Sequence, residues 1–207
     1  MPWPTPNYIK KIQQHPQELL DFIAFIREAN ICSYLEIGCK FGGSLWSVAY
    51  AMPKRGRVVA VDLPHGHWGR SDSEAPLREC VAQLRRNGFD AHLFLGDSTA
   101  PQIVQSVRAL APFDCVFIDA NHTEQYVRTD FINYGKLARY CCFHDIGWRQ
   151  PTPVNRLPIE VPKVWAELKV TFQDQAKWFR EIKHDNGHNG IGIIKWKSAD
   201  DFKCPSI

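Results

Sequence analysis

The sequence lacks the features that mark several other protein classes. No apolar run approaches the roughly 18 residues that a membrane span requires, and the start, Met1 to Pro6, has no basic region followed by an apolar stretch. The formal charge is only +3, and Lys and Arg are scattered instead of forming a dense basic stripe. We therefore expect a soluble, cytoplasmic protein that is not exported and has neither a membrane nor a nucleic acid as its partner.

The seven cysteines include no C-x-x-C pair, and several lie within strand-like apolar runs. This pattern is typical of reduced core residues in a cytosolic protein. With 207 residues and 44% hydrophobic content, the chain is long enough for one well-buried α/β domain. We expect an irregular, proline-interrupted arm at 1–15 and a single domain at 16–207. The arm could also fold onto a second subunit, which leaves a homo-oligomer open.

Strand-like and helix-like segments alternate along most of the chain. Leu19, Phe22, Ile23 and Ile26 indicate an amphipathic helix, with Pro16 in its first turn. After it, strands are predicted at 33–37, 57–62, 91–95, 114–119 and 139–144, separated by helices at 44–52, 74–87, 99–109 and 123–136. Such alternation predicts the α/β class, with a Rossmann-like, doubly wound and mainly parallel sheet covered by helices on both faces.

The last part of the chain changes character. A helix at 159–168 precedes strands at 178–183 and 191–196, and the D-N-G-H-N-G turn at 185–190 between these strands is a hairpin signal. The prediction is therefore a seven-stranded sheet that is completed by a C-terminal antiparallel hairpin.

A glycine-rich turn follows the first predicted strand. Gly38, Gly42 and Gly43 leave room for a ligand against the backbone, and the helix from Ser44 offers free N–H groups. Glu36 at this turn argues against a phosphate ligand, because a diphosphate favours an acid-free cradle at the positive end of a helix. A sulfonium cofactor that also carries an ammonium group, S-adenosylmethionine, fits a carboxylate at this place.

These residues resemble the class I S-adenosylmethionine-dependent methyltransferases, in the branch of small, often metal-assisted O-methyltransferases that includes cephalosporin-hydroxylase-like proteins. The resemblance spans roughly residues 17 to 195 and consists of six pieces in order along the chain. They are E-I-G-x-x-x-G-G-S from Glu36, V-V-A-V-D-L-P from Val58, L-G-D-S from Leu95, F-D-C-V-F-I-D-A-N-H from Phe113, F-H-D-I from Phe143 and G-I-G-I-I from Gly190. The resemblance implies methyltransferase activity and an antiparallel pair that ends the sheet.

The expected cofactor contacts follow from these pieces. Asp62, at the end of the second predicted strand, can accept hydrogen bonds from both ribose hydroxyls, with a strand-end or capping role as the alternative. The resemblance places the adenine amino group at Asp97 and Ser98, although Asp97 could instead cap the following helix. The full set expected at the cofactor is Glu36, Gly38, Lys40, Gly42, Gly43, Ser44, Asp62, Leu63, Gly96, Asp97, Ser98 and Asp119.

The resemblance makes the end of the fourth predicted strand the catalytic one. It implies that Asp119 is a metal ligand or a substrate-facing acid. His122 has two chemical roles open, as a general base that takes a hydroxyl proton or as a ligand. The alternative is that His122 makes only turn contacts just before Thr123, an N-cap for the next helix.

A cation site is expected where the fourth and fifth predicted strands end. The carboxylates of Asp119 and Asp145 could share one Mg²⁺ or Mn²⁺, which would lower the pKa of a bound substrate hydroxyl. His144 is a third candidate ligand, but neighbours on a strand point oppositely, so it faces the ion together with Asp145 only if the strand has already ended. Asn121 and His144 stand where many relatives have acids, which favours Mn²⁺ or a metal-free mechanism.

The loops beyond the strand ends are expected to hold the substrate. Candidate contacts in the loop at 63–75 are His65, His67, Trp68 and Arg70, with a solvated loop as the alternative. The segment 147–158 is expected to form a second wall or a lid.

The resulting prediction is an S-adenosylmethionine-dependent O-methyltransferase acting on a small hydroxylated molecule or sugar. The main alternative is a member of the same fold that binds the cofactor without methylating, either hydroxylase-like or a binding subunit. A nicotinamide oxidoreductase is disfavoured, because the glycine spacing is not G-x-G-x-x-G and no Tyr-x-x-x-Lys pair follows.

Overall fold

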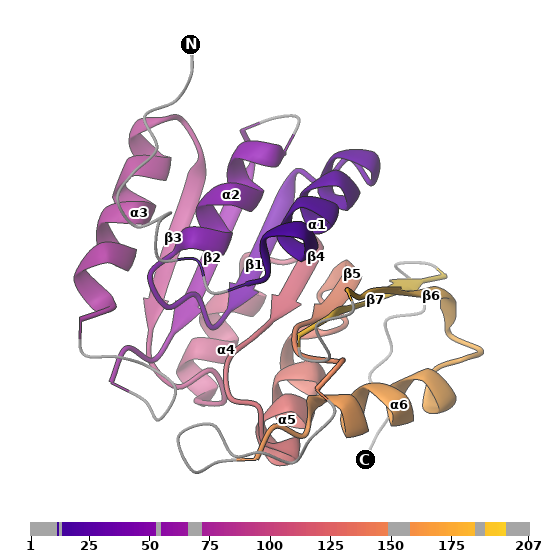
Figure 1. The fold of residues 1–207 in the computed structure, drawn as a ribbon. Helices are drawn as coiled ribbons and strands as arrows, with labels where there is room; N and C mark the ends of the chain where they lie inside the picture. Colours follow the sequence, from indigo (N-terminus) through magenta and orange to yellow (C-terminus); the bar gives the residue numbers. More distant parts are fainter. Residues whose placement is uncertain are drawn as a thin grey trace.

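The computed structural model describes residues 12, 14–52, 55–65, 72–148, 158–184 and 189–197. They contain a seven-stranded sheet with the strand order β3-β2-β1-β4-β5-β7-β6 (Figure 1). Its strands are β1 (Ser33–Ile37), β2 (Arg57–Asp62), β3 (Asp90–Leu95), β4 (Phe113–Ile118), β5 (Ala138–Phe143), β6 (Ala176–Ile182) and β7 (Ile191–Trp196). The first five run parallel, and β7 pairs antiparallel with both β5 and β6. The predicted fold class is therefore confirmed.

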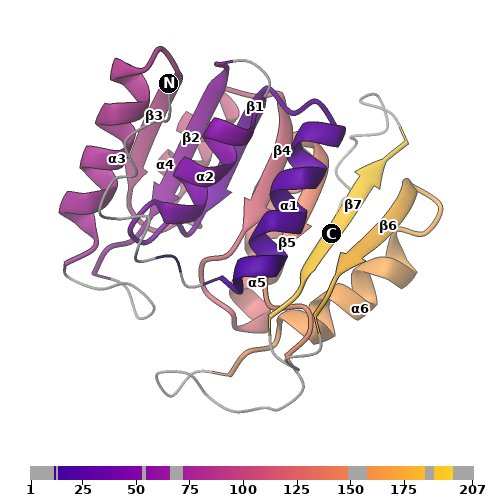
Figure 2. The same ribbon diagram turned by 45° about the horizontal axis from the view of Figure 1, so that its top comes forward.

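Helices cover both faces of this sheet. They are α1 (Pro16–Glu28), α2 (Gly43–Ala51), α3 (Glu74–Arg86), α4 (Pro101–Arg108), α5 (Glu124–Tyr134) and α6 (Val161–Thr171). Figure 2 shows α1, α2 and α3 on the near face, and the buried side chains of α4, α5 and α6 belong to the apolar layer on the opposite face. The crossover helices thus leave the carboxyl ends of the parallel strands along one edge of the sheet.

Two apolar layers follow from the alternation of side chains along each strand. On β1, Tyr34 belongs to the layer beneath α1, α2 and α3, whereas Leu35 and Ile37 belong to the opposite layer. Phe22 of α1 packs on Phe117 of β4 with ring centroids 5.1 Å apart. Burial of a side chain of this size stabilises the fold by about 2 kcal/mol, so the apolar stripe of α1 is sufficient to dock it on the sheet.

Small differences from the predicted boundaries matter for the site. β4 and β5 both end one residue before the predicted limits, at Ile118 and Phe143. Asp119 and His144 therefore lie beyond the strands, where the strict alternation of side chains no longer applies. α4 begins at Pro101, because the preceding residues form a turn.

The C-terminal hairpin brings a distant part of the chain to the same edge. The predicted turn at 185–190 lies partly outside the described residues, but Asn189 and Gly190 are described. The carbonyl of Asn189 accepts a hydrogen bond from Gly147 N–H at 2.6 Å, and that of Gly190 accepts one from Ile146 N–H at 3.2 Å.

In the described part of the chain, none of the helices combines the length and apolar character of a membrane span.

We predict that Gly192→Ala destabilises the protein. A Cβ at Gly192 would lie 2.8 Å from the indole of Trp165, which packs between α6 and the sheet and is itself buried. Overpacking of this kind costs about 1 to 3 kcal/mol, and the free energy of unfolding from urea denaturation measures it.

The control is Val170→Ala, an exposed position on α6, which should change stability by less than about 0.5 kcal/mol. Equal stability of Gly192→Ala and the natural protein would show that Trp165 can move aside.

Candidate active site

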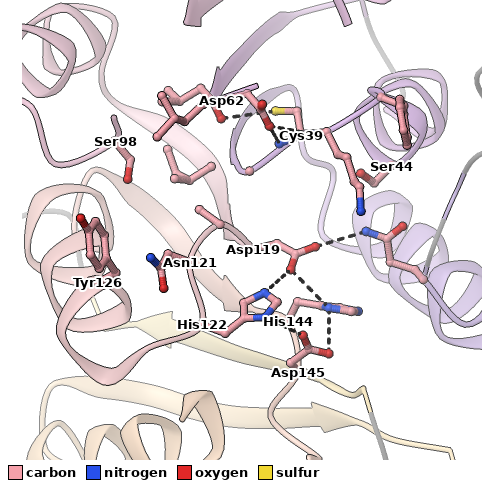
Figure 3. Close-up of a pocket in the computed structure, with 18 of the residues that line it drawn as sticks. Cys39, Ser44, Asp62, Ser98, Asp119, Asn121, His122, Tyr126, His144 and Asp145 are labelled. Atoms are coloured by element: carbon pink, nitrogen blue, oxygen red, sulfur yellow. Dashed lines mark hydrogen bonds and ion pairs between the residues drawn. The ribbon is translucent and has the colours of Figure 1, made fainter. Parts of the chain in front are cut away.

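A single continuous cavity of about 450 Å³ lies at the carboxyl ends of the parallel strands. One of its ends is formed by the glycine-rich loop after β1 together with the residues that follow β2 and β3. The other end is formed by the acid and histidine side chains that follow β4 and β5 (Figure 3). Both ends lie where an open α/β sheet binds its ligands.

The glycine-rich loop lies directly against the end of β4. Gly38 has φ +90°, and a Cβ on it would be 2.2 Å from the carbonyl oxygen of Asp119. Gly42 has φ +82°, and a Cβ there would be 2.8 Å from the Sγ of Cys80 in α3. Only glycine combines this backbone conformation with such close approach. The two glycines therefore permit the loop to contact both α3 and the chain that carries Asp119.

Asp62 stabilises this loop from the end of β2. Its Oδ2 accepts hydrogen bonds from the backbone N–H groups of Cys39 at 2.8 Å and Lys40 at 2.7 Å. Its Oδ1 is buried and has no hydrogen-bond partner among the described residues, although Asp62 lines the cavity. Burial raises the pKa of Asp62, and the two N–H donors oppose this rise. A buried acceptor without a donor favours a ligand that supplies one.

Glu36 lies beneath the loop instead of in the cavity wall. Its carboxyl group accepts hydrogen bonds from the hydroxyls of Tyr34 at 2.7 Å and Ser44 at 2.6 Å. Full burial raises the pKa of Glu36 to about 8, although both hydroxyls act in the opposite direction. Glu36 therefore ties β1 to the start of α2, and its expected contact with the cofactor remains a prediction.

The other predicted cofactor residues lie around the same end of the cavity. Leu63, Gly96, Asp97 and Ser98 line it, and the Leu63 side chain is 47% exposed. Asp97 Oδ1 accepts hydrogen bonds from the N–H and the hydroxyl of Thr99, each at 2.8 Å. Asp97 thus stabilises the turn before α4 and borders the cavity, but the N-cap of α4 is Ala100 without a side-chain cap hydrogen bond, so the predicted capping role of Asp97 is wrong. Lys40, Gly43 and Ser44 complete this end, whereas Gly42 lies behind the wall.

Four side chains form a compact cluster at the other end of the cavity (Figure 3). His122 contacts the carboxylates of Asp119 and Asp145 through its two ring nitrogens, at 3.3 and 3.4 Å. His144 Nδ1 lies 3.4 Å from Asp119 Oδ1 and 3.2 Å from Asp145 Oδ1. The tertiary fold therefore brings together every residue that the sequence predicted for catalysis or metal binding.

The backbone after β5 explains how His144 and Asp145 both reach this cluster. β5 ends at Phe143, and Asp145 has φ +60°, in the left-handed region that Asp tolerates better than most residues. This turn directs both adjacent side chains to the carboxylate of Asp119. One oxygen or nitrogen from each of Asp119, His144 and Asp145 lies within 4.8 Å of the others, a spacing that suits a single cation.

The cluster combines two carboxylates with two imidazoles, and the charges of these groups depend on one another. Burial alone would lower the pKa of His144, but the carboxylates of Asp119 and Asp145 outweigh it and raise this pKa well above its usual range. Burial alone would raise the pKa of Asp119, but His144 and His122 hold it well below its usual range. Each carboxylate is thus paired with the imidazoles, and a cationic ligand would compete with His144 and His122 for these acids.

Asn121 has a local role in the turn after β4. Its Oδ1 accepts hydrogen bonds from the N–H and the hydroxyl of Thr123, each at 3.0 Å. This turn precedes α5, and it fixes the backbone between Asp119 and His122. The neutral amide thus shapes the loop and does not join the cluster of acids and histidines.

Several cavity residues were not foreseen from the sequence. They are Ile12, Gln14, Phe41, Tyr126, Ile159 and Asn189. Gln14 donates a hydrogen bond to Asp119 Oδ2 at 3.3 Å from just before α1. These residues come from the arm, the loop after β1, helix α5 and the segments before α6 and β7, and no single local motif connects them. Trp148, from the segment predicted as a second wall, does line the cavity.

The predicted substrate contacts in the loop after β2 are only partly described. His65 lies 3.5 Å from Glu74 at the start of α3, and its side chain is mostly exposed. It is not part of the cavity wall. His67, Trp68 and Arg70 lie outside the described residues, so their contact with substrate remains a prediction.

A family model described as a methyltransferase domain matches residues 35–146, from β1 through the turn after β5. The chain belongs to this methyltransferase family. The predicted membership of the class I S-adenosylmethionine-dependent methyltransferases is thereby confirmed, and the matched residues contain both ends of the cavity. No curated protein matches the methyltransferase in sequence.

Solved structures share the fold of this methyltransferase at low sequence identity. An O-methyltransferase from Bacillus cereus, in complex with SAH, has a TM-score of 0.67 at 15% identity, over 94% of this chain and 93% of the other. The O-methyltransferase TomG from Streptomyces achromogenes, involved in tomaymycin synthesis and in complex with SAM, has a TM-score of 0.63 at 17% identity, over 94% and 91%. A protein from Staphylococcus aureus that is assigned as a caffeoyl-CoA O-methyltransferase has a TM-score of 0.61 at 18% identity, over 89% of this chain and 85% of the other.

We predict that Glu36→Gln changes the pH dependence of the methyltransferase's stability. With a pKa of about 8, folded Glu36 keeps a proton that the unfolded chain releases near its ordinary pKa, about 4.3. The folded state therefore binds more protons between these values, and the stability of the natural protein falls as pH rises. A glutamine at this position does not titrate, so Glu36→Gln lacks this loss of stability. As pH rises, the stability of the variant relative to the natural protein should therefore increase by on the order of 1 kcal/mol per pH unit.

Urea denaturation at pH values from about 5 to about 8 measures this difference, with the exposed Glu28→Gln as the matched control. A stability difference that does not change with pH would mean that Glu36 is ionised in the folded protein.

Proposed function

We propose that this protein is an S-adenosylmethionine-dependent O-methyltransferase that acts on a small hydroxylated molecule or sugar, assisted by a divalent cation. The observation that carries the proposal is the continuity of the cavity. The loop that fits the cofactor and the cluster that fits an acid–base or metal role border one space, and they meet at the contact of Gly38 with Asp119. A methyl group held at this contact would lie next to the catalytic side chains.

The proposed cofactor position uses the residues at the first end of the cavity. The unpartnered Oδ1 of Asp62 would accept a ribose hydroxyl, and the exposed Leu63 would pack on the adenine ring. Ser98 would contact the adenine edge from the far side of the cavity. The carboxylates that follow β4 and β5 would favour the positively charged sulfonium.

The methyl transfer is an in-line displacement. The acceptor oxygen forms a bond to the methyl carbon while the bond from carbon to sulfur breaks, and the cofactor leaves as a neutral thioether. The proton of the acceptor hydroxyl goes to His122 in this proposal. Since both ring nitrogens of His122 face carboxylates, one of these contacts must give way to the substrate. The alignment of oxygen, carbon and sulfur is the main contribution of the protein.

The cluster also fits a divalent cation. Asp119, Asp145 and His144 would supply two carboxylate oxygens and one imidazole nitrogen, and these atoms already face a common point. A bound divalent ion would lower the pKa of the acceptor hydroxyl and help to hold it. A donor set with one nitrogen suits Mn²⁺ better than Mg²⁺.

The second end of the cavity indicates the kind of acceptor. Tyr126 and Trp148 offer aromatic side chains, and Asn121 and Asn189 offer amide groups. Such walls suit a compact molecule with both an apolar face and hydroxyls, such as a phenol or a sugar. The cavity volume of about 450 Å³ is shared with the cofactor, which argues for a small acceptor or one that extends out of the cavity.

One observation favours a second function. The engagement of both His122 ring nitrogens by carboxylates is also what a protein that binds the cofactor without methylating would show. Binding of S-adenosylmethionine together with no transfer to any phenol, catechol or sugar tested would favour this alternative.

We predict that Asp62→Ala weakens S-adenosylmethionine binding at least about tenfold. The variant loses the acceptor for the ribose and the two hydrogen bonds that hold the Cys39 and Lys40 backbone. Isothermal titration calorimetry measures the effect, and micromolar binding is expected for the natural protein.

The control is Asp90→Ala, an exposed acid at the opposite edge of the sheet. Undetectable binding by the natural protein would overturn the proposed function, and equal binding by Asp62→Ala would overturn the assigned ribose contact.

We predict that His122→Ala lowers kcat for methyl transfer by about 10²- to 10⁴-fold, because the acceptor proton loses its base. Binding of S-adenosylmethionine should change little, since His122 lies at the other end of the cavity. Transfer of a labelled methyl group to a panel of phenols, catechols and sugars measures the rate.

The partly exposed His92, on β3 and outside the cavity wall, gives the control His92→Ala for loss of a histidine. Unchanged transfer by His122→Ala would remove His122 as the base.

A further inference from the structure

Glu18 is a buried acid in the first turn of α1, far along the chain from the catalytic cluster. It is 1% exposed, yet both carboxylate oxygens are engaged. Oε1 lies 2.9 Å from His144 Nε2, and Oε2 accepts the backbone N–H of Gly190 at 2.5 Å. A buried carboxylate is costly unless donors surround it, so this placement requires both partners.

The contact with Glu18 determines how His144 faces the cavity. The Glu18 carboxylate can accept the N–H at Nε2, which fixes the ring so that the other ring nitrogen, Nδ1, faces the two acids. Nδ1 lies 3.4 Å from Asp119 Oδ1 and 3.2 Å from Asp145 Oδ1, within the proposed cation site. A histidine that binds a metal through one nitrogen commonly donates its other N–H to a carboxylate, which fixes the ring and makes it a better ligand.

We infer that Glu18 is a positioning residue for a divalent cation, because it orients His144 so that Nδ1 completes the site made with Asp119 and Asp145. The inference rests on the proposed function of this cavity and adds a residue from outside it. The expected cations are transition metals such as Mn²⁺ and Co²⁺, because they accept an imidazole nitrogen as a ligand more readily than Mg²⁺ does. Glu18 also joins α1 to the hairpin end, so the same carboxylate holds the wall that contains Asn189.

The test compares metal binding by the natural protein, Glu18→Gln and Glu18→Ala. Titration with Co²⁺, followed by its absorption bands, and with Mn²⁺, followed by electron paramagnetic resonance, gives the affinities directly. The loss of an orienting carboxylate should weaken the binding of both ions by about 10- to 100-fold. Glu18→Ala should bind the ions more weakly than Glu18→Gln. The natural protein should bind Mn²⁺ more tightly than Mg²⁺ in competition.

The matched control is Glu28→Gln, the same change on the same helix at an exposed residue that pairs with Arg180. Each variant is also titrated with S-adenosylmethionine, which reports whether the cavity is still folded. A purely structural role for Glu18 would lower both affinities together or neither, and either result would overturn the inference. Absence of Co²⁺ and Mn²⁺ binding by the natural protein would overturn it too, while retained cofactor binding would leave the methyltransferase proposal intact.

A second measurement needs no change at Glu18. In the Zn²⁺-loaded natural protein, nitrogen NMR of the His144 ring should show a protonated Nε2 and a metal-bound Nδ1. Coordination through Nε2, or a ring that the metal does not perturb, would contradict the inference even if the Glu18 variants did not fold.

Discussion

The site depends on the close approach of two backbone segments, the glycine-rich loop after β1 and the end of β4. The absence of a side chain on Gly38 lets the carbonyl of Asp119 lie where a Cβ would otherwise be, at 2.2 Å. The N–H of Asp119 in turn bonds to the carbonyl of Ile37 at 2.8 Å. This contact joins the two ends of the cavity. A larger residue at Gly38 would separate the loop from the catalytic side chains, and one ligand could no longer reach both.

Electrostatics gives the two ends of the cavity different characters. Glu36 and Asp62 are acids near the loop, but burial raises the pKa of each, and Glu36 makes its hydrogen bonds to hydroxyls beneath the loop. At the other end, imidazoles hold Asp119 in its charged form. The carboxylates after β4 and β5 therefore lie where a sulfonium or a metal cation is needed. The end at the glycine-rich loop, with the buried and hydrogen-bonded Asp62, is suited to the sugar and base of an adenosine cofactor.

The sequence predicted the fold well because its strongest signals are local. Apolar runs of strand length, separated by amphipathic segments, determine alternating strands and helices, and β1 and β2 begin and end at the predicted residues. Asp62 and Asp119 were also predictable as strand-end residues. The predicted β4 and β5 were placed one residue too far along the chain, because an apolar or aromatic pattern does not show where hydrogen bonding between strands starts and stops. That single residue decides that His144 and Asp145 can face one point.

The sequence by itself determined the family, the order of the elements and the chemical types available at each strand end, because these depend on short segments and on spacing along the chain. Only the tertiary structure decided which distant residues meet. Glu18 is an ordinary acid in the first turn of an amphipathic helix until α1 docks against β5 and the hairpin, and Gln14, Tyr126 and Asn189 become cavity residues in the same way. Their roles arise from packing between segments more than a hundred residues apart in the case of Glu18 and His144, and no local pattern encodes such a contact.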